Sequence, residues 1–306
     1  MRVLSTAEQV RAALAPLRRT GRTVALVPTM GALHAGHLSL VRMAREHADV
    51  AVVSIFVNPL QFGPGEDLAT YPRDLGGDLA QLAPAGVDLV FTPDAAAFTP
   101  PAGRTTVAVR GLTTVLEGAS RPGHFDGVTT VVAKLLAVVR PDVAVFGEKD
   151  YQQLVVLHTM VADLDLGVEV LAGPLVREAD GLALSSRNAH LSAVDRRQAL
   201  ALSAALGEVA AAWDADADRA RSLLASRLRG APGVRADYAE VVDPVTLAPL
   251  HGVVPGPARA LVAAWVGRTR LIDNVGLQPT TPPMRRRPGV GAPTSPTATP
   301  TREHRS

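Results

Sequence analysis

The chain has 306 residues, of which 47% are apolar, enough for about two domains with sizeable cores, and it has no cysteine, which excludes disulfides. Its formal charge is only +2, and residues 281–306 hold five arginines and one glutamate, so the remainder is slightly acidic and offers no basic surface for nucleic acid. Apolar runs end before the roughly 20 residues of a membrane span. We therefore expect a cytoplasmic protein with neither a membrane nor a nucleic acid as partner.

Strands and helices alternate along the first half of the chain. Short, β-branched apolar runs predict strands, and the segments between them are predicted to be helices, which is typical of a doubly wound parallel sheet; these runs lie near residues 23–28, 50–57, 88–91, 142–146 and 168–172. The expected fold is therefore α/β, with a Rossmann-like domain over residues 1–173.

The pattern changes after Gly173. Two helix faces and strands at 236–242 and 258–266 predict a smaller α+β domain over residues 174–278. Residues 279–306 are rich in Pro, Thr, Ser and Gly and have few large apolar side chains, so we expect this basic tail to be disordered.

The turn after the first of these core strands carries two histidines in a His-x-Gly-His pattern, His34 and His37. In an open α/β sheet, ligands bind at the carboxyl ends of strands, where a helix N-terminus favours anions. Gly31 and Gly36 let the backbone approach a ligand closely. Alone, the pattern is also compatible with a plain strand-to-helix connection whose histidines cap the helix.

A second polar cluster, Gly147 to Asp150, follows the strand at 142–146. The chain has only two lysines, Lys134 and Lys149, although arginine is abundant. A compact ammonium contacts several phosphate oxygens where a planar guanidinium does not fit. Lys134 lies on an amphipathic helical segment from which it can snorkel, so Lys149 is the functional candidate.

A third segment, Leu184 to Asn188, places two serines and an arginine in a polar stretch before a helix that starts near Ser192. Taken alone it is a capping or loop signal. Together with the histidine motif and Lys149, it is interpreted as a mobile clamp that closes over a triphosphate. In a separate stretch, Asp126 is predicted to be a helix N-cap, and the role of His124 stays open.

Five stretches together resemble the pantothenate synthetase (pantoate–β-alanine ligase) family of the nucleotidyltransferase superfamily, over about residues 1–278; they are PTMGALHAGH at 28–37, SIFVNPLQF at 54–62, YPR at 71–73, FGEKDYQQ at 146–153 and LSSRN at 184–188. The resemblance implies a homodimeric ligase that joins pantoate to β-alanine with ATP and Mg²⁺. The reaction passes through a pantoyl adenylate and releases AMP and pyrophosphate.

The resemblance also implies roles for single residues. His37, as general acid, would act with His34, Lys149 and Arg187 in catalysis. Pantoate would be held by Gln61 and Gln153, in a pocket that Asn58 and Tyr71 also line. The residues implied to bind ATP are Met30, Gly31, Ala32, Leu33, His34, Ala35, Gly36, His37, Gly147, Glu148, Lys149, Asp150, Val176, Leu184, Ser185, Ser186 and Arg187.

This chain departs from the family pattern at two places. Leu184 stands where methionine is common, an exchange that an apolar contact tolerates. The family's Tyr-Pro-Arg-Thr run ends here in Asp74, which leaves the carboxylate nearest the magnesium open between Asp74 and Asp78.

The chemistry of amide formation agrees with these residue types. A carboxylate must be activated before an amine can attack it. For adenylation the protein must position the reactants and neutralise charge, and it needs no covalent nucleophile. Closure of residues 174–278 over the first domain would then exclude water from the adenylate.

Other interpretations stay open. A nucleotide adenylyltransferase would need further basic residues where this chain has Gln61 and Gln153. A non-catalytic ATP-binding regulator would not need both histidines, Lys149 and Arg187 together. An aminoacyl-tRNA synthetase would need more chain to recognise tRNA.

Overall fold

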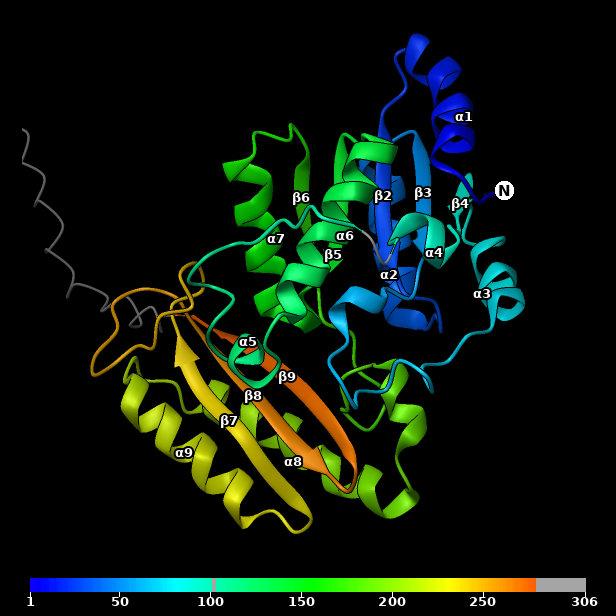
Figure 1. Cartoon of the computed structure of the whole chain (residues 1–306). Helices are drawn as coiled ribbons and strands as arrows, with labels where there is room; N and C mark the ends of the chain where they lie inside the picture. Colours follow the sequence, from blue (N-terminus) through cyan, green and yellow to red (C-terminus); the bar gives the residue numbers. More distant parts are fainter. Residues whose placement is uncertain (101–102, 279–306) are drawn as a thin grey trace, which may run out of the picture.

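The computed structural model describes residues 1–100 and 103–278, so the tail predicted to be disordered lies outside the described residues. The first part of the chain forms a six-stranded sheet (Figure 1), in which every pair of neighbouring strands is parallel. Its strand order is β1-β4-β3-β2-β5-β6. The strands are β1 (Arg2–Leu4), β2 (Val24–Thr29), β3 (Val50–Ile55), β4 (Leu89–Phe91), β5 (Val143–Gly147) and β6 (Glu169–Gly173). The predicted α/β class is confirmed, and β1 is an edge strand too short for its pattern to predict.

Helices cover both faces of this sheet because alternate strand residues point to opposite sides. On β2, Val24 and Leu26 belong to the core under α1 (Ala7–Arg19), α6 (His124–Val139) and α7 (Tyr151–Asp163). Their neighbours Ala25 and Val27 pack on the other side against α2 (Ala35–His47) and α3 (Leu75–Leu82). Short helices complete the connections; they are α4 (Ala95–Phe98), α5 (Glu117–Ser120), η1 (Pro59–Gln61) and η2 (Glu148–Asp150).

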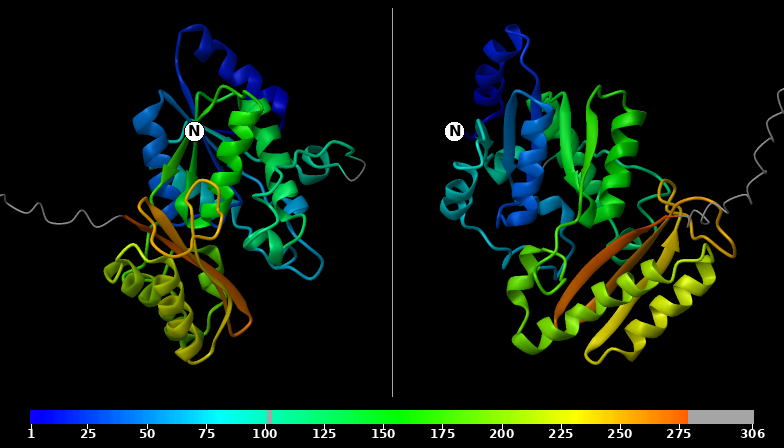
Figure 2. Two further views of the ribbon diagram at one scale, coloured as in Figure 1. Left: turned by 90° about the vertical axis from the view of Figure 1, so that its left-hand side faces the viewer. Right: turned by 180° about the vertical axis from the view of Figure 1, so that it is seen from behind.

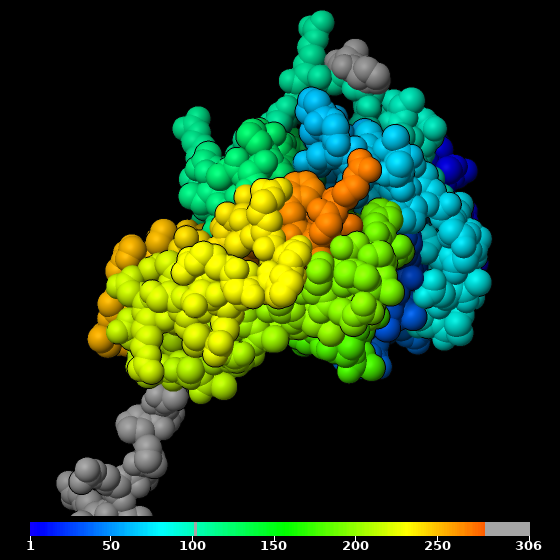
Figure 3. Space-filling view, turned by 90° about the horizontal axis from the view of Figure 1, so that it is seen from below, coloured from blue at the N-terminus to red at the C-terminus, as the bar shows by residue number. Residues whose placement is uncertain are grey.

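A second unit follows β6 (Figure 2). It has a hydrophobic core of its own. Helices α8 (Ala193–Ala211) and α9 (Ala217–Gly230) pack on an antiparallel sheet of β7 (Val234–Val242), β8 (Ala258–Val266) and β9 (Thr269–Leu277). The two predicted strands are present, whereas β9 was not predicted. Seen from below, this unit, in yellow to orange, meets the cyan segments of the first unit (Figure 3).

Helix starts follow local capping chemistry. Thr6, one of two predicted caps, forms a capping box with Gln9 at the start of α1. The helix predicted to start near Ser192 is α8, and Ser192 is its N-cap. The prediction that Asp126 caps a helix was wrong. Gly123, with φ of 82°, is the N-cap residue, so α6 begins at His124 and Asp126 lies in its first turn. No helix within 1–100 and 103–278 is long and apolar enough to cross a membrane.

Candidate active site

The three polar segments found in the sequence meet at the topological switch point of the sheet. From β2 the chain runs outward through β3 to β4, whereas β5 and β6 lie on the other side of β2. The carboxyl ends of β2 and β5 therefore border the crevice where open α/β sheets bind ligands. The histidine turn leaves β2 there, and η2 with Lys149 leaves β5.

A hollow of about 220 Å³ occupies this crevice. Most of the predicted site residues line it, from the histidine turn, the lysine turn and the serine–arginine segment as well as the proposed pantoate pocket; they are Met30, His34, Gly36, His37, Asn58, Gln61, Tyr71, Gly147, Lys149, Asp150, Gln153, Val176, Leu184, Ser185, Ser186 and Arg187. Five predicted ATP contacts are not among the lining residues, namely Gly31, Ala32, Leu33, Ala35 and Glu148.

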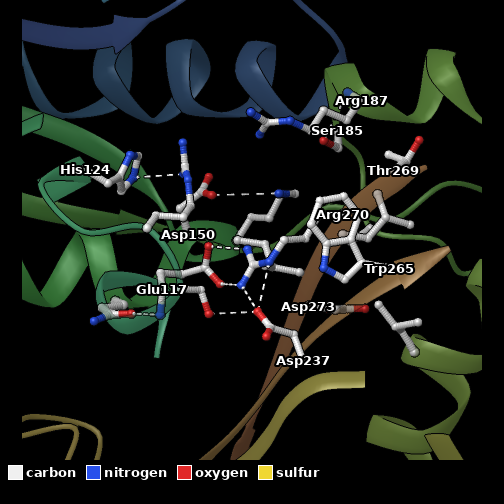
Figure 4. A pocket seen from close by; sticks show the side chains of 18 of the residues that line it. Glu117, His124, Asp150, Ser185, Arg187, Asp237, Trp265, Thr269, Arg270 and Asp273 are labelled. Atoms are coloured by element: carbon white, nitrogen blue, oxygen red, sulfur yellow. Dashed lines mark hydrogen bonds and ion pairs between the residues drawn. The ribbon is translucent and has the colours of Figure 1, made fainter. Parts of the chain in front are cut away.

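A larger hollow of about 580 Å³ adjoins the first and extends between the two units (Figure 4). Its walls include α5, β7 and β9 as well as the lysine turn. Seven residues line both hollows and so mark their junction, namely Arg121, His124, Lys149, Asp150, Gln153, Ser185 and Arg187. A ligand in the crevice is therefore reachable from the space between the units.

The two motif histidines stack on each other, with ring centroids 4.0 Å apart. Burial, and then the neighbouring His34, lowers the pKa of His37 to about 3. Burial, and then Lys149, lowers the pKa of His34. Both rings are thus neutral at pH 7, and within the described residues both Nδ1 atoms are buried without a hydrogen-bond partner. His34 is the N-cap residue of α2 but its side chain does not cap the helix. The alternative role of these histidines as caps is thus not seen, and ligand oxygens would satisfy them.

A buried carboxylate shapes the histidine turn. Asp78 is 3% exposed and accepts hydrogen bonds from the backbone N–H groups of Ala32 (3.1 Å) and Leu33 (2.8 Å). The turn needs this support because Gly31 has φ of 81° and Ala32 has φ of 50°. A Cβ at Gly31 would lie 2.8 Å from Asp78 Oδ2, so only glycine fits beside the carboxylate.

Neither carboxylate considered for the magnesium is placed for that role. Asp78 is engaged by the turn, and Asp74 caps α3 by accepting from Gly77 N at 2.9 Å. In the part of the chain that the structure describes, neither lines either hollow.

Replacing Asp78 with asparagine should lower the free energy of unfolding by about 1–3 kcal/mol, because the amide group turns one acceptor into a donor that faces a backbone N–H. Urea denaturation measures this loss, and the affinity for an ATP analogue should weaken with it. Asp74→Asn is the matched control, since asparagine is an equally good N-cap. Equal stability of the two variants would contradict the role given to Asp78.

The serine–arginine segment is held against a loop of the first unit. Arg187 binds Asp67 through two hydrogen bonds, Nε to Oδ2 at 2.9 Å and Nη2 to Oδ1 at 3.0 Å. The hydroxyls of Tyr71 and Ser186 are 3.2 Å apart. Ser186 also begins η3 (Ser186–His190). The sequence predicts a mobile clamp that closes over a triphosphate; in the structure its arginine already has an anionic partner that a triphosphate must replace or share.

At the proposed pantoate end, Asn58 orients Gln61. The Asn58 side chain is buried, and its Nδ2 donates to Gln61 Oε1 and to Gly127 O, each at 3.0 Å. With Oε1 occupied, Gln61 has its Nε2 donors left, and these have no partner within the described residues. Asn58 thus acts mainly through Gln61.

The two adjacent glutamines of α7 differ in what they contact. Gln152 is 4% exposed, accepts from Glu117 N at 2.9 Å and donates to the carbonyls of Leu112 and Val115 at 2.7 and 2.8 Å. Gln152 also borders the larger hollow, but its amide is taken up by these backbone groups. Gln153 lines both hollows and is the one of the two that lines the crevice at the switch point.

His124, whose role the sequence left open, lies at the junction of the hollows. Arg121 Nη1 faces His124 Nε2 at 3.2 Å, and because an arginine only donates, Nε2 must accept. The Nδ1–H then donates to Gln61 O at 2.8 Å. Burial, and then Arg121, lowers the pKa of His124 to about 4. Arg121 is itself held by Glu66 at 2.6 Å, so this group fixes the backbone of Gln61.

The neutral, buried state of His37 predicts a pH dependence of stability. Above the unfolded pKa of about 6.5 the ring is neutral in both states. As the pH falls from there towards the folded pKa of about 3, the unfolded chain binds a proton that the folded chain does not, and stability falls by up to about 1.4 kcal/mol per pH unit. Urea denaturation from pH 7 to 5 should show a shallower decline for His37→Asn. Identical slopes would rule out this assignment.

The sheet order, the two hollows and the cluster of His, Lys, Ser and Arg side chains at the switch point define the class as an α/β nucleotide-binding enzyme. A family model described as pantoate-beta-alanine ligase matches residues 2–276. The chain belongs to the pantoate–β-alanine ligase family.

Individual relatives agree with this. The chain is 53% identical to the pantothenate synthetase of Myxococcus xanthus over 279 residues, covering 90% of this chain and 96% of that protein. It is 54% identical to the Mycolicibacterium smegmatis enzyme over 284 residues, covering 90% and 88%. Among solved structures, pantothenate synthetase from Thermus thermophilus has a TM-score of 0.86 at 50% identity, with 91% of this chain and 100% of that chain covered.

A more distant structure carries ligands. Pantoate-beta-alanine ligase from Francisella tularensis, complexed with beta-gamma ATP and beta-alanine, has a TM-score of 0.74 at 33% identity, with 90% of this chain and 97% of that chain covered.

Proposed function

We propose that this chain joins pantoate to β-alanine with ATP, through a pantoyl adenylate, and releases AMP and pyrophosphate. The observation that carries the proposal is that one hollow at the switch point is lined by the histidine motif, Lys149 and the Ser185–Arg187 segment. The names of the relatives and the ligands of the Francisella tularensis structure support the same reaction.

In this proposal the triphosphate lies across the ends of β2 and β5. The N-terminus of α2 and the neutral His34 and His37 rings donate to phosphate oxygens. The pantoate carboxylate attacks the α-phosphorus, and the bond to pyrophosphate breaks. Lys149 and Arg187 then neutralise the charge that develops on the departing pyrophosphate.

Pantoate is placed by amides rather than by cations. Gln61, with its Oε1 held by Asn58, presents its Nε2 donors, and Gln153 and Tyr71 line the same hollow. Uncharged donors orient a carboxylate without neutralising the charge that it needs as a nucleophile. In the second step, β-alanine enters from the larger hollow and its amine attacks the adenylate carbonyl, which expels AMP.

Magnesium fits this site as a partner of the phosphates. The described residues hold no group of three or more His, Cys, Asp or Glu side chains that could bind a metal ion, and among them Asp150 is the one carboxylate lining the smaller hollow. Mg²⁺ commonly takes one or two carboxylates and completes its shell with phosphates and water. Asp150 would hold the ion, which would supply further charge neutralisation for pyrophosphate.

We also propose a domain division at residues 173/174, a homodimer and a cytoplasmic location. The division is supported by the hydrophobic clusters. Two of them are built from residues up to β6, and another is built from residues that follow β6. The homodimer rests on the family resemblance, and light scattering of the purified protein tests it. Closure of residues 174–278 on nucleotide binding would be contradicted by unchanged geometry between the units with an ATP analogue.

The reaction is tested by incubating the purified protein with ATP, Mg²⁺, pantoate and β-alanine and measuring AMP while each component is omitted in turn. We expect AMP only when all are present, and pyrophosphate from a single turnover when β-alanine alone is missing. AMP production that does not depend on pantoate, or a requirement for a phosphate acceptor as in an adenylyltransferase, would contradict the proposal.

A further inference from the structure

Two adjacent residues of β9, Asp273 and Asn274, contact both of the segments that the proposed mechanism brings to the phosphates. Both are buried, at 3% exposure each, although β9 belongs to the second unit. Buried polar side chains are retained where hydrogen bonds satisfy them. Their partners therefore indicate what these two residues are for.

Asn274 binds the turn that carries Lys149. Its Nδ2 donates to the backbone carbonyls of Glu148 and Lys149, each at 3.0 Å. Its Oδ1 accepts from Arg259 Nε at 2.9 Å, which fixes the orientation of the amide. The two carbonyls belong to consecutive residues, so the side chain fixes the direction in which the lysine leaves the backbone.

Arg259, on β8, also binds the turn that carries Lys149. Its Nη2 lies 3.0 Å from Glu148 Oε2, and its guanidinium carbon lies 4.0 Å from the ring centroid of Tyr151. The side chain is 12% exposed, so the ion pair and the stacking are largely shielded from water. This explains why Glu148 does not line the nucleotide hollow although its sequence neighbours do.

Asp273 binds the hairpin that leads into the serine–arginine segment. It forms a bidentate ion pair with Arg177, with Oδ2 2.6 Å from Nη1 and Oδ1 2.9 Å from Nη2. Arg177 Nη1 also donates to Gly181 O at 3.1 Å, and Arg177 pairs with Ala183 across the hairpin. Ser185 follows two residues later. Asp273 thus supports the segment from its base.

We infer that Asp273 and Asn274 are positioning residues for adenylate formation: this pair on one strand fixes the spacing between Lys149 and the Ser185–Arg187 segment. The inference rests on the proposed function. Both residues border the larger hollow, but their side chains bind protein groups, namely Arg177 for Asp273 and the lysine turn with Arg259 for Asn274. Two adjacent residues on one strand keep a fixed separation, so both phosphate-binding segments are held to the same rigid element. A displacement of about 1 Å at a reacting group can cost about 10²-fold in rate.

The test measures pyrophosphate release in a single turnover with ATP and pantoate, for Asn274→Ala, Asp273→Asn and Arg259→Lys. Each variant should lower the rate constant of adenylation, by up to about 10²-fold, while the Michaelis constant for pantoate stays near that of the unmodified chain. Arg259→Lys keeps the charge and should lose less than Arg259→Ala. For the double variant of Asp273 and Asn274, the fold-decrease in the rate constant of adenylation should be smaller than the product of the two single decreases. Both residues fix the same distance, that between Lys149 and the Ser185–Arg187 segment.

Arg221→Ala is the matched control for lost stability. Arg221 is also a largely buried arginine of the second unit, with 20% exposure, and its partners Asp218, Glu240 and the carbonyl of Leu250 all lie in that unit. We expect it to lower the free energy of unfolding but not the rate constant of adenylation. Unchanged adenylation in the Asn274 and Asp273 variants, or an equal loss in Arg221→Ala, would overturn the inference. If the unmodified chain releases no pyrophosphate, the proposed function itself fails.

Discussion

Replacing Lys149 with arginine should lower the rate of AMP release by about 10²–10³-fold, the loss typical of removing one group that stabilises charge in a transition state. The exchange keeps the positive charge, so the lower rate would result from the different shape of the side chain and not from a lost charge. An ammonium contacts several phosphate oxygens as a point charge, whereas the longer planar guanidinium presents its donors in a fixed fork that does not take up the same position. Lys149 lines both hollows, with Asp150 Oδ1 3.8 Å from its Nζ.

The other lysine supplies the control for this prediction. Lys134 Nζ donates to Phe98 O and lies 4.8 Å from the centroid of the Phe98 ring, on the side of α6 that packs under α4. Lys134→Arg should therefore leave the rate of AMP release nearly unchanged. Circular dichroism establishes that both variants are folded. A near-normal rate for folded Lys149→Arg would refute the role of the ammonium.

The strands that could be predicted are those whose apolar runs are continuous. A buried parallel strand such as β2 is apolar on both faces, so its sequence alone marks it. Strand β9 was missed because the buried pair Asp273 and Asn274 interrupts its pattern, and their burial depends on partners in other elements. A strand that buries polar side chains is thus not recognised from its pattern of apolar residues.

The site was predictable to the extent that each polar segment follows a recognisable strand or precedes a helix. Its supporting residues were not, because they lie far away in the sequence. Asp78 is 45 residues from Leu33, and Asn274 is 125 residues from Lys149. Nothing local to a carboxylate in a helix or an amide in a strand indicates which distant backbone it binds.

The contacts between the units constrain how the site can close. Asn274 and Arg259 join the second unit to the lysine turn, whereas Arg187 joins the clamp to Asp67 in the first unit. A rigid rotation of residues 174–278 would break the first set of contacts. A movement limited to the serine–arginine segment would leave those contacts intact. It would break the pair with Asp67, which a triphosphate can replace, and the contact between the Tyr71 and Ser186 hydroxyls. The geometry therefore favours local closure of the clamp over movement of the whole second unit.

Replacing Gln61 with glutamate should lower kcat/KM for pantoate by about 10²-fold or more, because two like charges brought together at a desolvated site cost several kcal/mol. The fold should tolerate the exchange. Asn58 Nδ2 can still donate to the retained oxygen, which now stands 3.0 Å away as Oε1. The amide donors, however, are replaced by a carboxylate oxygen that faces the pantoate carboxylate. Affinity for an ATP analogue should stay unchanged.

Two comparisons separate charge from the loss of a donor. Gln61→Met removes the donors without adding charge, so its loss in kcat/KM for pantoate should be smaller than that of Gln61→Glu. Protonation restores an O–H donor to the glutamate, so the ratio of variant to unmodified activity should rise as the pH is lowered from about 7.5 towards about 5.5. If Gln61→Glu keeps a normal KM for pantoate, Gln61 does not face the substrate carboxylate, and the orientation imposed by Asn58 serves only the fold.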